Sequence, residues 1–219
     1  LYTIMDRAKA NGYATGVVTN SYITDATPGT FLAHVTNRYA WSNIALDFVN
    51  SNVDFIAGGG MIQTMSSETS EYKGEDSIGL THEYKGPDDA VPALVELGYQ
   101  RYFGLDGAVR MLEAIEHQSF NSEKSICLFT GGQLPFEYYK YRSPHSNNYD
   151  NVPSLVDMTE AGIQSLSQNE NGFIMMIESA LIDKAGHDFS QEKGAYEVVA
   201  LNDLLEHLVD FYSEYPDDT

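Results

Sequence analysis

The sequence predicts an α/β fold with a largely parallel central sheet and helices on both of its faces. Short apolar, often β-branched runs typical of buried strands recur along the chain, at residues 14–19, 53–57, 125–129 and 172–177. Longer segments with helical periodicity separate these runs, and alternating helix and strand is the pattern of a parallel sheet. The length of 219 residues is compatible with one large α/β domain.

The expected helices take their bounds from apolar periodicity and from stop signals such as Asn11-Gly12. They cover residues 1–11, 28–35, 41–50, 90–97, 105–117, 152–168 and 195–212, and a short extended segment is expected at 100–103. The last helix is expected to close the domain with Val198, Val199, Leu201, Leu205, Leu208 and Val209. No internal repeat divides the chain.

Two polar or irregular stretches, about 61–88 and 131–151, interrupt the pattern and are expected to be insertions above the sheet. The chain opens on Leu1-Tyr2-Thr3 rather than on a start signal, and it stops where a further strand would fit. We therefore expect residues 1–219 to form a partial single domain that is incomplete at both ends.

Composition excludes several classes of partner. Twelve Lys and Arg against 32 Asp and Glu give a formal net charge of −20, which excludes binding to the phosphate backbone of nucleic acids. No run of about 18 apolar residues is present, so no membrane span is expected.

Polar side chains follow the most apolar strand at the point where it ends. Glu178, Asp183 and His187 come directly after residues 172–177. Ligands of open α/β sheets collect at the carboxyl ends of the strands, so a site is expected here. Asp183 and His187, four residues apart, can reach one Zn²⁺ ion, and the Glu178 carboxylate better suits Mg²⁺. Taken alone this spacing is weak, since Glu178 could equally cap a helix and His187 could lie on the surface.

A second segment follows the first strand. The segment has an ordinary structural interpretation, in which Asp25 or Thr27 caps a helix and Pro28 takes the first helical position. Arg38 would then end that helix beside its negative pole. The same residues would also border the sheet edge that carries Glu178, so the structural and functional interpretations both remain open.

Together the segments resemble the alkaline phosphatase family. The resemblance runs from Ala8 to Gly16 through Asp25-Ala26-Thr27-Pro28, Ala33-His34-Val35 and Arg38, then Gly58-Gly59-Gly60, then Ile177 to His187. Order and distances fit across nearly the whole chain. The fold that the resemblance implies is the three-layer sandwich of that family, of the bacterial metal-dependent type.

The resemblance also implies roles for individual residues. Thr27 and Glu178 would hold Mg²⁺, Asp183 and His187 would hold the first Zn²⁺, and Asp25 would reach the magnesium through water. Arg38 would grip the substrate phosphate with its planar fork of donors. Lys184 would pair with Asp25 or approach the phosphate through water.

The implied activity is that of a phosphomonoesterase, which hydrolyses phosphate monoesters through a phosphoserine intermediate. The serine nucleophile lies upstream of residue 1 in the family, and Asp76-Ser77 stands at the wrong place to replace it. We therefore expect the chain alone to be inactive. The alternatives are a related metallohydrolase, such as a phosphodiesterase, sulfatase or phosphomutase, and a non-catalytic homologue that binds divalent cations.

Partners and location follow from the resemblance only. The expected ligand is a phosphate monoester or inorganic phosphate, the expected assembly is a homodimer, and the expected location is periplasmic or secreted.

Overall fold

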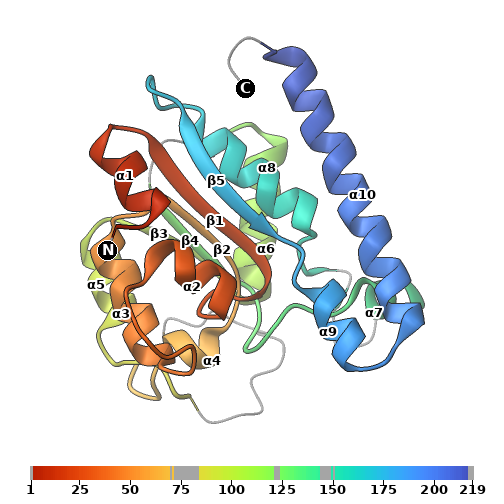
Figure 1. Ribbon diagram of the computed structural model, residues 1–219, viewed down its shortest axis with the longest axis horizontal. Helices are drawn as coiled ribbons and strands as arrows, with labels where there is room; N and C mark the ends of the chain where they lie inside the picture. The colour runs from red at the N-terminus through yellow and green to blue at the C-terminus, as the bar shows by residue number, and fades with distance from the viewer. Residues whose placement is uncertain are drawn as a thin grey trace.

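A five-stranded, wholly parallel sheet forms the centre of the computed structural model (Figure 1). The structure describes residues 2–69, 71, 84–120, 124–143, 149 and 151–216. Its strands are β1 (Ala14–Tyr22), β2 (Phe55–Gly59), β3 (Gln100–Phe103), β4 (Ser125–Leu128) and β5 (Phe173–Glu178), in the spatial order β3-β4-β2-β1-β5. Every neighbouring pair is parallel, which confirms the predicted fold class.

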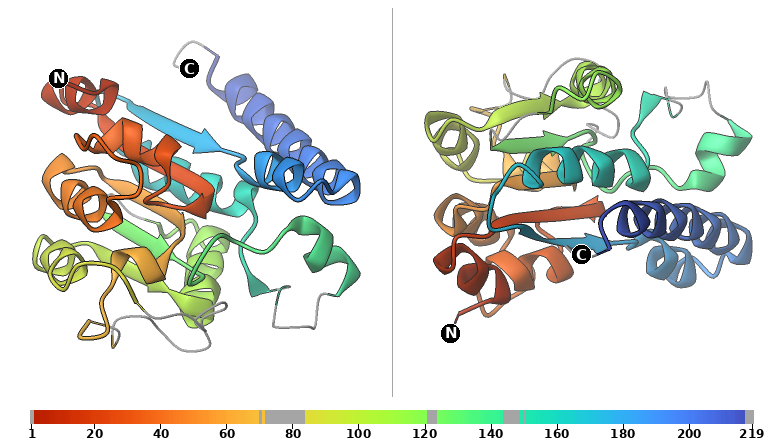
Figure 2. Two further views of the ribbon diagram at one scale, coloured as in Figure 1. Left: turned by 60° about the horizontal axis from the view of Figure 1, so that its bottom comes forward. Right: turned by 90° about the horizontal axis from the view of Figure 1, so that it is seen from above.

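Helices cover both faces of this sheet (Figure 2). One face carries α1 (Ile4–Ala10), α2 (Ala26–Leu32), α3 (Trp41–Ser51), α4 (Met61–Thr64) and α5 (Ala90–Glu96). The opposite face carries α6 (Gly104–Glu116), α8 (Leu155–Leu166) and part of α10 (Gln191–Glu214). The remaining described helices, α7 (Glu137–Arg142) and α9 (Leu181–His187), lie at the end of the sheet where the strands stop (Figure 1).

Successive strand residues enter two different cores. Val17 packs with the helices of one face and Val18 with those of the other, and Ile126 and Cys127 divide in the same way. Because neighbouring side chains point to opposite faces of a strand, a strand buried on both sides must be apolar throughout. This explains why the strands appear as continuous apolar runs in the sequence.

Several elements differ from their predicted bounds. The helix expected at 28–35 begins at Ala26 and ends at Leu32, so Arg38 lies in the loop between α2 and α3 and does not end a helix. Pro28 is the third helical residue, not the first, but it is still in the first turn where its missing N–H costs no hydrogen bond. The final helix starts at Gln191, four residues earlier than expected, with Ser190 as its N-cap.

The two expected insertions contain ordered elements. Residues 61–88 begin with α4, and the side chains of Met61 and Met65 are fully buried in the core. Residues 131–151 contain α7, a short helix that the irregular sequence did not indicate. The pair Asp76-Ser77 lies outside the described residues, and the boundaries of both insertions stay a prediction.

The long α10 packs on the domain along one stripe only. Leu204 is buried, and Leu201 and Leu208 pack against the core, whereas Val198 and Val209 are more than half exposed. The expected closing role of this helix therefore holds for one of its faces. Among the described residues, no helix has the length and apolar character needed to cross a membrane.

Candidate functional site at the carboxyl end of the sheet

The last residue of β5 is bound to the end of β1. Thr19 and Glu178 are partners in the parallel register of these strands, and Thr19 Oγ1 donates to Glu178 Oε2 at 2.7 Å. Thr19 is fully buried, while Glu178 is partly exposed. The Glu178 carboxylate is thus fixed by one hydroxyl at the edge where all strands stop, and it does not cap α9, whose N-cap is Ala180.

Asp25 gathers donors from three elements. It is the N-cap of α2, where its Oδ1 accepts from the Ala26 N–H at 2.8 Å and from Arg38 Nη2 at 2.9 Å. Its Oδ2 accepts from Ser21 Oγ and from Lys184 Nζ, both at 3.0 Å. Only 7% of Asp25 is exposed. The helix-capping residue of the structural interpretation is therefore also the carboxylate that joins two cations.

The electrostatics of this cluster keep Asp25 and Lys184 charged. Burial opposes the charged form of Asp25, but hydrogen bonds from the Ala26 N–H, Lys184 and Ser21 outweigh it and lower the pKa of the carboxyl group. Burial also opposes the charge on Lys184, and its hydrogen bond to Asp25 outweighs burial and raises the pKa of the ammonium group. Both shifts describe an ion pair that is charged at neutral pH.

A continuous path of hydrogen bonds joins Arg38 to Glu178. Arg38 donates to Asp25, Asp25 accepts from the Ser21 hydroxyl, the Ser21 N–H donates to Thr19 Oγ1 at 3.0 Å, and Thr19 donates to Glu178. These residues therefore lie at one edge of the sheet. Thr19 and Ser21 were not predicted. Their signal is two hydroxyl side chains at alternate positions, both directed into the site, that follow the apolar residues Val17 and Val18 of β1.

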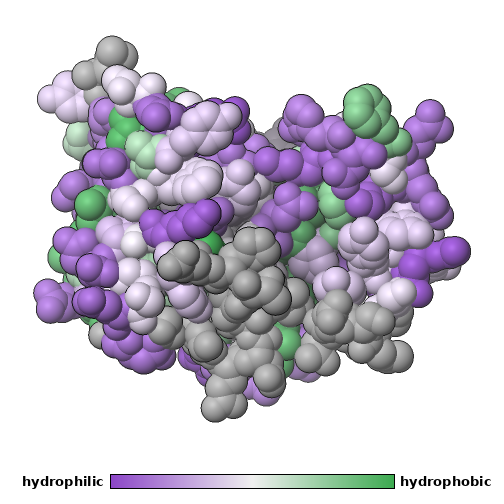
Figure 3. All heavy atoms as spheres, turned by 90° about the horizontal axis from the view of Figure 1, so that it is seen from below, coloured by the Kyte–Doolittle hydropathy of each residue, from purple (hydrophilic) through white to green (hydrophobic). Residues whose placement is uncertain are grey.

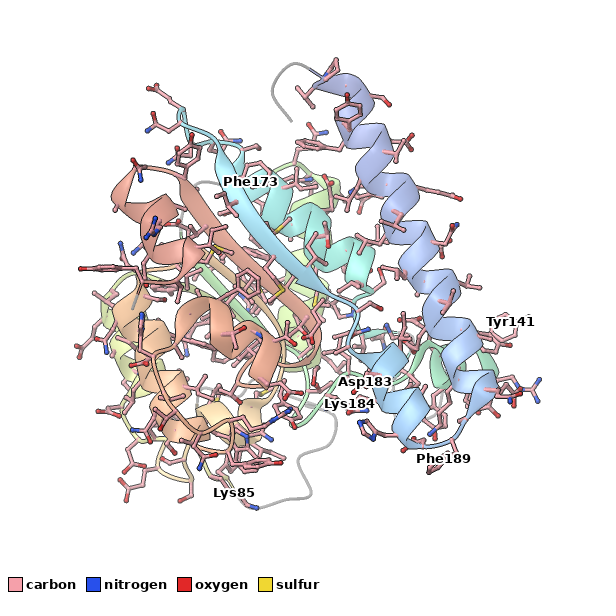
Figure 4. The ribbon with its side chains drawn as sticks, viewed as in Figure 1. Lys85, Tyr141, Phe173, Asp183, Lys184 and Phe189 are labelled. Carbon is pink, nitrogen blue, oxygen red and sulfur yellow. The ribbon has the colours of Figure 1, made fainter. Side chains whose placement is uncertain are left out.

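Helix α9 carries Asp183, Lys184 and His187, and Figure 4 shows Asp183 and Lys184 just beyond the end of β5. Asp183 Oδ2 lies 3.5 Å from His187 Nε2, and these side chains are 75% and 78% exposed. Thr27 is exposed in the first turn of α2, and the Arg38 side chain is 55% exposed. Thr27, Arg38, Asp183 and His187 thus face solvent, whereas Glu178 and Lys184 are partly exposed and Asp25 is buried.

The donor types suit the metals that the sequence suggested, but each set is partial. Asp183 and His187 lie on the same side of one helix and offer the oxygen and nitrogen ligands that Zn²⁺ accepts. Within the part of the chain that the structure describes, no three His, Cys, Asp or Glu side chains form a metal-binding group. The described residues fit the metals as part of a larger ligand set.

The surface around this edge is open and polar. Figure 3 shows the molecule from below, and hydrophilic side chains make up most of the face that is not grey. Two surface cavities of about 470 Å³ lie elsewhere, one lined by residues such as Tyr99 and Arg110 and the other by residues such as Tyr2 and His34. Neither of these two cavities is lined by a predicted site residue.

Comparison with known proteins gives a consistent result. The family model described as alkaline phosphatase matches residues 1–219. The alkaline phosphatase of Escherichia coli (strain K12) is 26% identical over 244 residues, which cover 95% of this chain and 48% of that protein. Alkaline phosphatase 3 of Bacillus subtilis (strain 168) is 30% identical over 192 residues, covering 85% of this chain and 34% of that protein. The chain spans about half or less of the length of these curated relatives.

Solved structures agree with the fold. The cold-active alkaline phosphatase of a psychrophilic Shewanella has a TM-score of 0.74 and 28% identity, covering 99% of this chain and 44% of that one. The Thermus thermophilus alkaline phosphatase has a TM-score of 0.77 at 24% identity. The match covers 99% of this chain and 40% of that one, and it supports the fold alone. A third structure is a variant of the alkaline phosphatase from the Antarctic bacterium TAB5, described with Mg bound in its M3 site. It has a TM-score of 0.70 at 25% identity, and the match covers 96% of this chain and 51% of that one.

Proposed function

The chain belongs to the alkaline phosphatase family, and we propose that the complete protein is a metal-dependent phosphomonoesterase to which these residues contribute the phosphate-gripping arginine and part of the metal sites. The observation that carries the proposal is the hydrogen-bond path from Arg38 through Asp25 to Glu178. It links a residue predicted to bind phosphate with one predicted to bind a metal. Both lie where α/β sheets bind their ligands.

Arg38 is suited to hold the substrate phosphate. Its Nη2 is fixed by Asp25, which orients the guanidinium, and its other nitrogens carry further donors for two phosphate oxygens. Lys184 adds a second positive charge on the opposite side of Asp25. Arg38 and Lys184 balance Asp25 with one positive charge in excess, but the Asp183 and Glu178 carboxylates also lie at this edge, so binding of an anion would depend on bound metal ions as well as on the two cations.

Thr27 and Glu178 would hold Mg²⁺, and Asp183 and His187 would hold one Zn²⁺, with Asp25 contacting the magnesium through water. Bound there, the metals would supply positive charge beside the phosphate as it is transferred. The exposed Asp183 and His187 can take these roles without a change in α9, whereas Thr19 orients Glu178. The remaining ligands and the serine that forms the phosphoserine intermediate would come from outside these residues, so we expect the 219 residues alone to be inactive.

Two further properties remain predictions that rest on the family. We expect a homodimer, which sedimentation of the complete protein would test. We expect a periplasmic or secreted location, which fractionation of the producing cells would test.

The decisive experiment replaces Arg38 in the complete protein. Arg38→Lys keeps the charge but loses the fork, so kcat/KM for a simple aryl phosphate should fall about 10-fold to 100-fold, the equivalent of losing one charged hydrogen bond. Arg7→Lys, an exposed arginine on α1, is the matched control and should leave kcat/KM unchanged.

The substrate itself separates the competing functions. Hydrolysis of an aryl phosphate in preference to its diester and sulfate analogues supports the proposal. A preference for either analogue would assign a related metallohydrolase, and binding of divalent cations without hydrolysis of any of the three would assign a non-catalytic homologue.

A further inference from the structure

A buried amide and a buried carboxylate meet behind the candidate site. Asn20, next to Thr19 on β1, is 6% exposed, and Glu197 on α10 is 0% exposed. Asn20 Nδ2 donates to Glu197 Oε2 at 3.4 Å, and the Glu137 N–H at the start of α7 donates to Glu197 Oε1 at 2.7 Å. On its other side, Asn20 Oδ1 accepts from the Leu181 N–H at 3.2 Å. One amide and one carboxylate therefore connect β1, α7, α9 and α10.

The direction of each hydrogen bond in this group is fixed by the backbone. The Leu181 N–H can only donate, so it requires the oxygen of Asn20 and turns the Asn20 NH₂ group toward Glu197. The Glu137 N–H can also only donate. Glu197 therefore faces two donors, one at each carboxylate oxygen, and accepts from both. A glutamine could accept from only one of them, because its other terminal atom is an NH₂ group.

The bond from Leu181 stabilises the start of α9. Leu181 is the first residue of α9, and the first N–H groups of a helix lack partners within it. The local N-cap, Ala180, makes no side-chain hydrogen bond, so Asn20 acts as a cap from a distant part of the chain. Helix α9 is also held by its packing on α10, by the contact of Leu181 and Ala185 with Phe136, and by the Lys184–Asp25 pair.

We propose that Asn20 and Glu197 are positioning residues, which seat α9 against the sheet and so place Asp183, Lys184 and His187 for metal and phosphate binding. The role of Asp183, Lys184 and His187 in binding rests on the proposed function, whereas the pairing of Asn20 with Glu197 does not. Figure 1 shows that α7, α9 and the start of α10 lie together beyond the strand ends.

The chemistry of the pair supports a positioning role. Burying an ionised carboxylate costs free energy, and a well-packed apolar residue at the same position is often the more stable choice. Burial raises the pKa of Glu197 to about 7, with Glu137 raising it further and Lys140 and the Glu137 N–H lowering it. A buried carboxylate that costs stability but accepts hydrogen bonds from Asn20 and from the start of α7 serves geometry better than stability.

Exchanging the two functional groups tests the proposal. In Glu197→Gln one donor meets the new amide NH₂, and in Asn20→Asp two carboxylates face each other. In the double variant N20D/E197Q, the new carboxylate at position 20 would accept from Leu181 and from the new amide, whose oxygen would accept from Glu137. All three hydrogen bonds then return with the charge moved. The matched control is N202D/E206Q, the same exchange at an exposed Asn–Glu pair on α10 whose hydrogen bond is 2.8 Å.

Two readouts are measured on the complete protein at pH 8, namely amide hydrogen exchange of α9 and zinc affinity by competition with a chelator. Each single variant should exchange its α9 amides about tenfold faster and bind Zn²⁺ about tenfold more weakly, as for the loss of one buried hydrogen bond. The double variant should return to within about twofold of the parent in both, and the control exchange should change neither.

Three results would overturn the proposal. These are α9 exchange unchanged in both single variants, a double variant no better than the worse single variant, or faster exchange in the single variants with unchanged zinc affinity. If Asn20→Asp does not accumulate as folded protein, recovery of folded protein in the double variant supports the pairing. If Glu197→Gln folds but the double variant does not, the pairing is contradicted. A parent protein without phosphatase activity would refute the proposed function but leave the exchange measurement intact.

Discussion

Replacing Asp25 by Asn tests the central cluster of the site. Oδ1 of Asp25 accepts from Ala26 and Arg38, and Oδ2 accepts from Ser21 and Lys184. An asparagine that keeps its oxygen toward Ala26 and Arg38 turns its NH₂ toward the other two. The Ser21 hydroxyl can rotate and accept, but the Lys184 ammonium has only donors. The substitution therefore removes the Lys184 contact first.

The expected loss of stability follows from how exposed each partner is. A hydrogen bond to a charged group contributes about 1.5–3 kcal/mol, and the Lys184 side chain is only 25% exposed, so most of that value applies. Arg38 is 55% exposed, and solvent screening limits its loss of charge attraction to about 0–1 kcal/mol. Together they give a decrease of about 2–3 kcal/mol in the free energy of unfolding at pH 7.

The loss should depend on pH. The pKa of Asp25 is lowered in the folded protein, so its charge stabilises the fold above the unfolded pKa of about 3.9. That contribution disappears as the pH falls through the lowered folded pKa. The difference between parent and Asp25→Asn should therefore be full at pH 7 and shrink at pH values below about 4.

Urea unfolding at several pH values measures this difference. The control is Asp188→Asn, which removes the partner of Lys193 at a carboxylate that is 49% exposed and should cost less than about 1 kcal/mol. A loss that is equal at pH 7 and pH 3, or no larger than that of the control, would refute the assignment of Asp25 as the centre of the charge cluster.

Three further predictions concern other parts of the chain. The parent should lose about 3 kcal/mol of stability as the pH rises from about 4.5 to about 7, because folding raises the Glu197 pKa from 4.5 to about 7. Urea unfolding across that pH range should show this loss in the parent and not in Glu197→Gln. Gly59→Ala should destabilise the protein by about 3 kcal/mol, since a Cβ there would lie 2.1 Å from the Gly132 carbonyl oxygen, whereas Gly132→Ala has open space and should cost nothing in the same urea assay. Asp183→Ala or His187→Ala should weaken zinc binding at least about 100-fold by calorimetry, while metal-free stability changes by less than about 0.5 kcal/mol because both side chains are exposed.

The central strands β2 and β4 were predictable because both of their faces are buried, so each is a short run of apolar and small residues. The apolar run of β5 was also predictable, and the site lies where it stops, at Ile177-Glu178. Asp25 was predictable for a different reason, since a cap residue followed by Pro28 indicates a helix start directly after a strand.

Other features depend on contacts that a sequence pattern does not contain. Arg38 was expected at a helix end, but α2 stops at Leu32, so the arginine lies in a loop and its orientation comes from Asp25. The role of Asn20 is invisible in the sequence, because its partners Leu181 and Glu197 lie 161 and 177 residues away. Local propensity carries no information about such pairings.

The register of β1 and β5 explains why these distant residues meet. The paired residues of the two strands, from Ala14 with Phe173 to Thr19 with Glu178, are all 159 positions apart. Asp25 and Lys184, which lie beyond the strand ends, are also 159 positions apart. One parallel register therefore sets the pairing of Glu178 with Thr19 and brings the starts of α2 and α9, which follow these strands, to the same edge of the sheet. A slip of one residue would turn every side chain of β5 to the opposite face and would separate Glu178 from Thr19, so the register of these two strands also sets the geometry of the site.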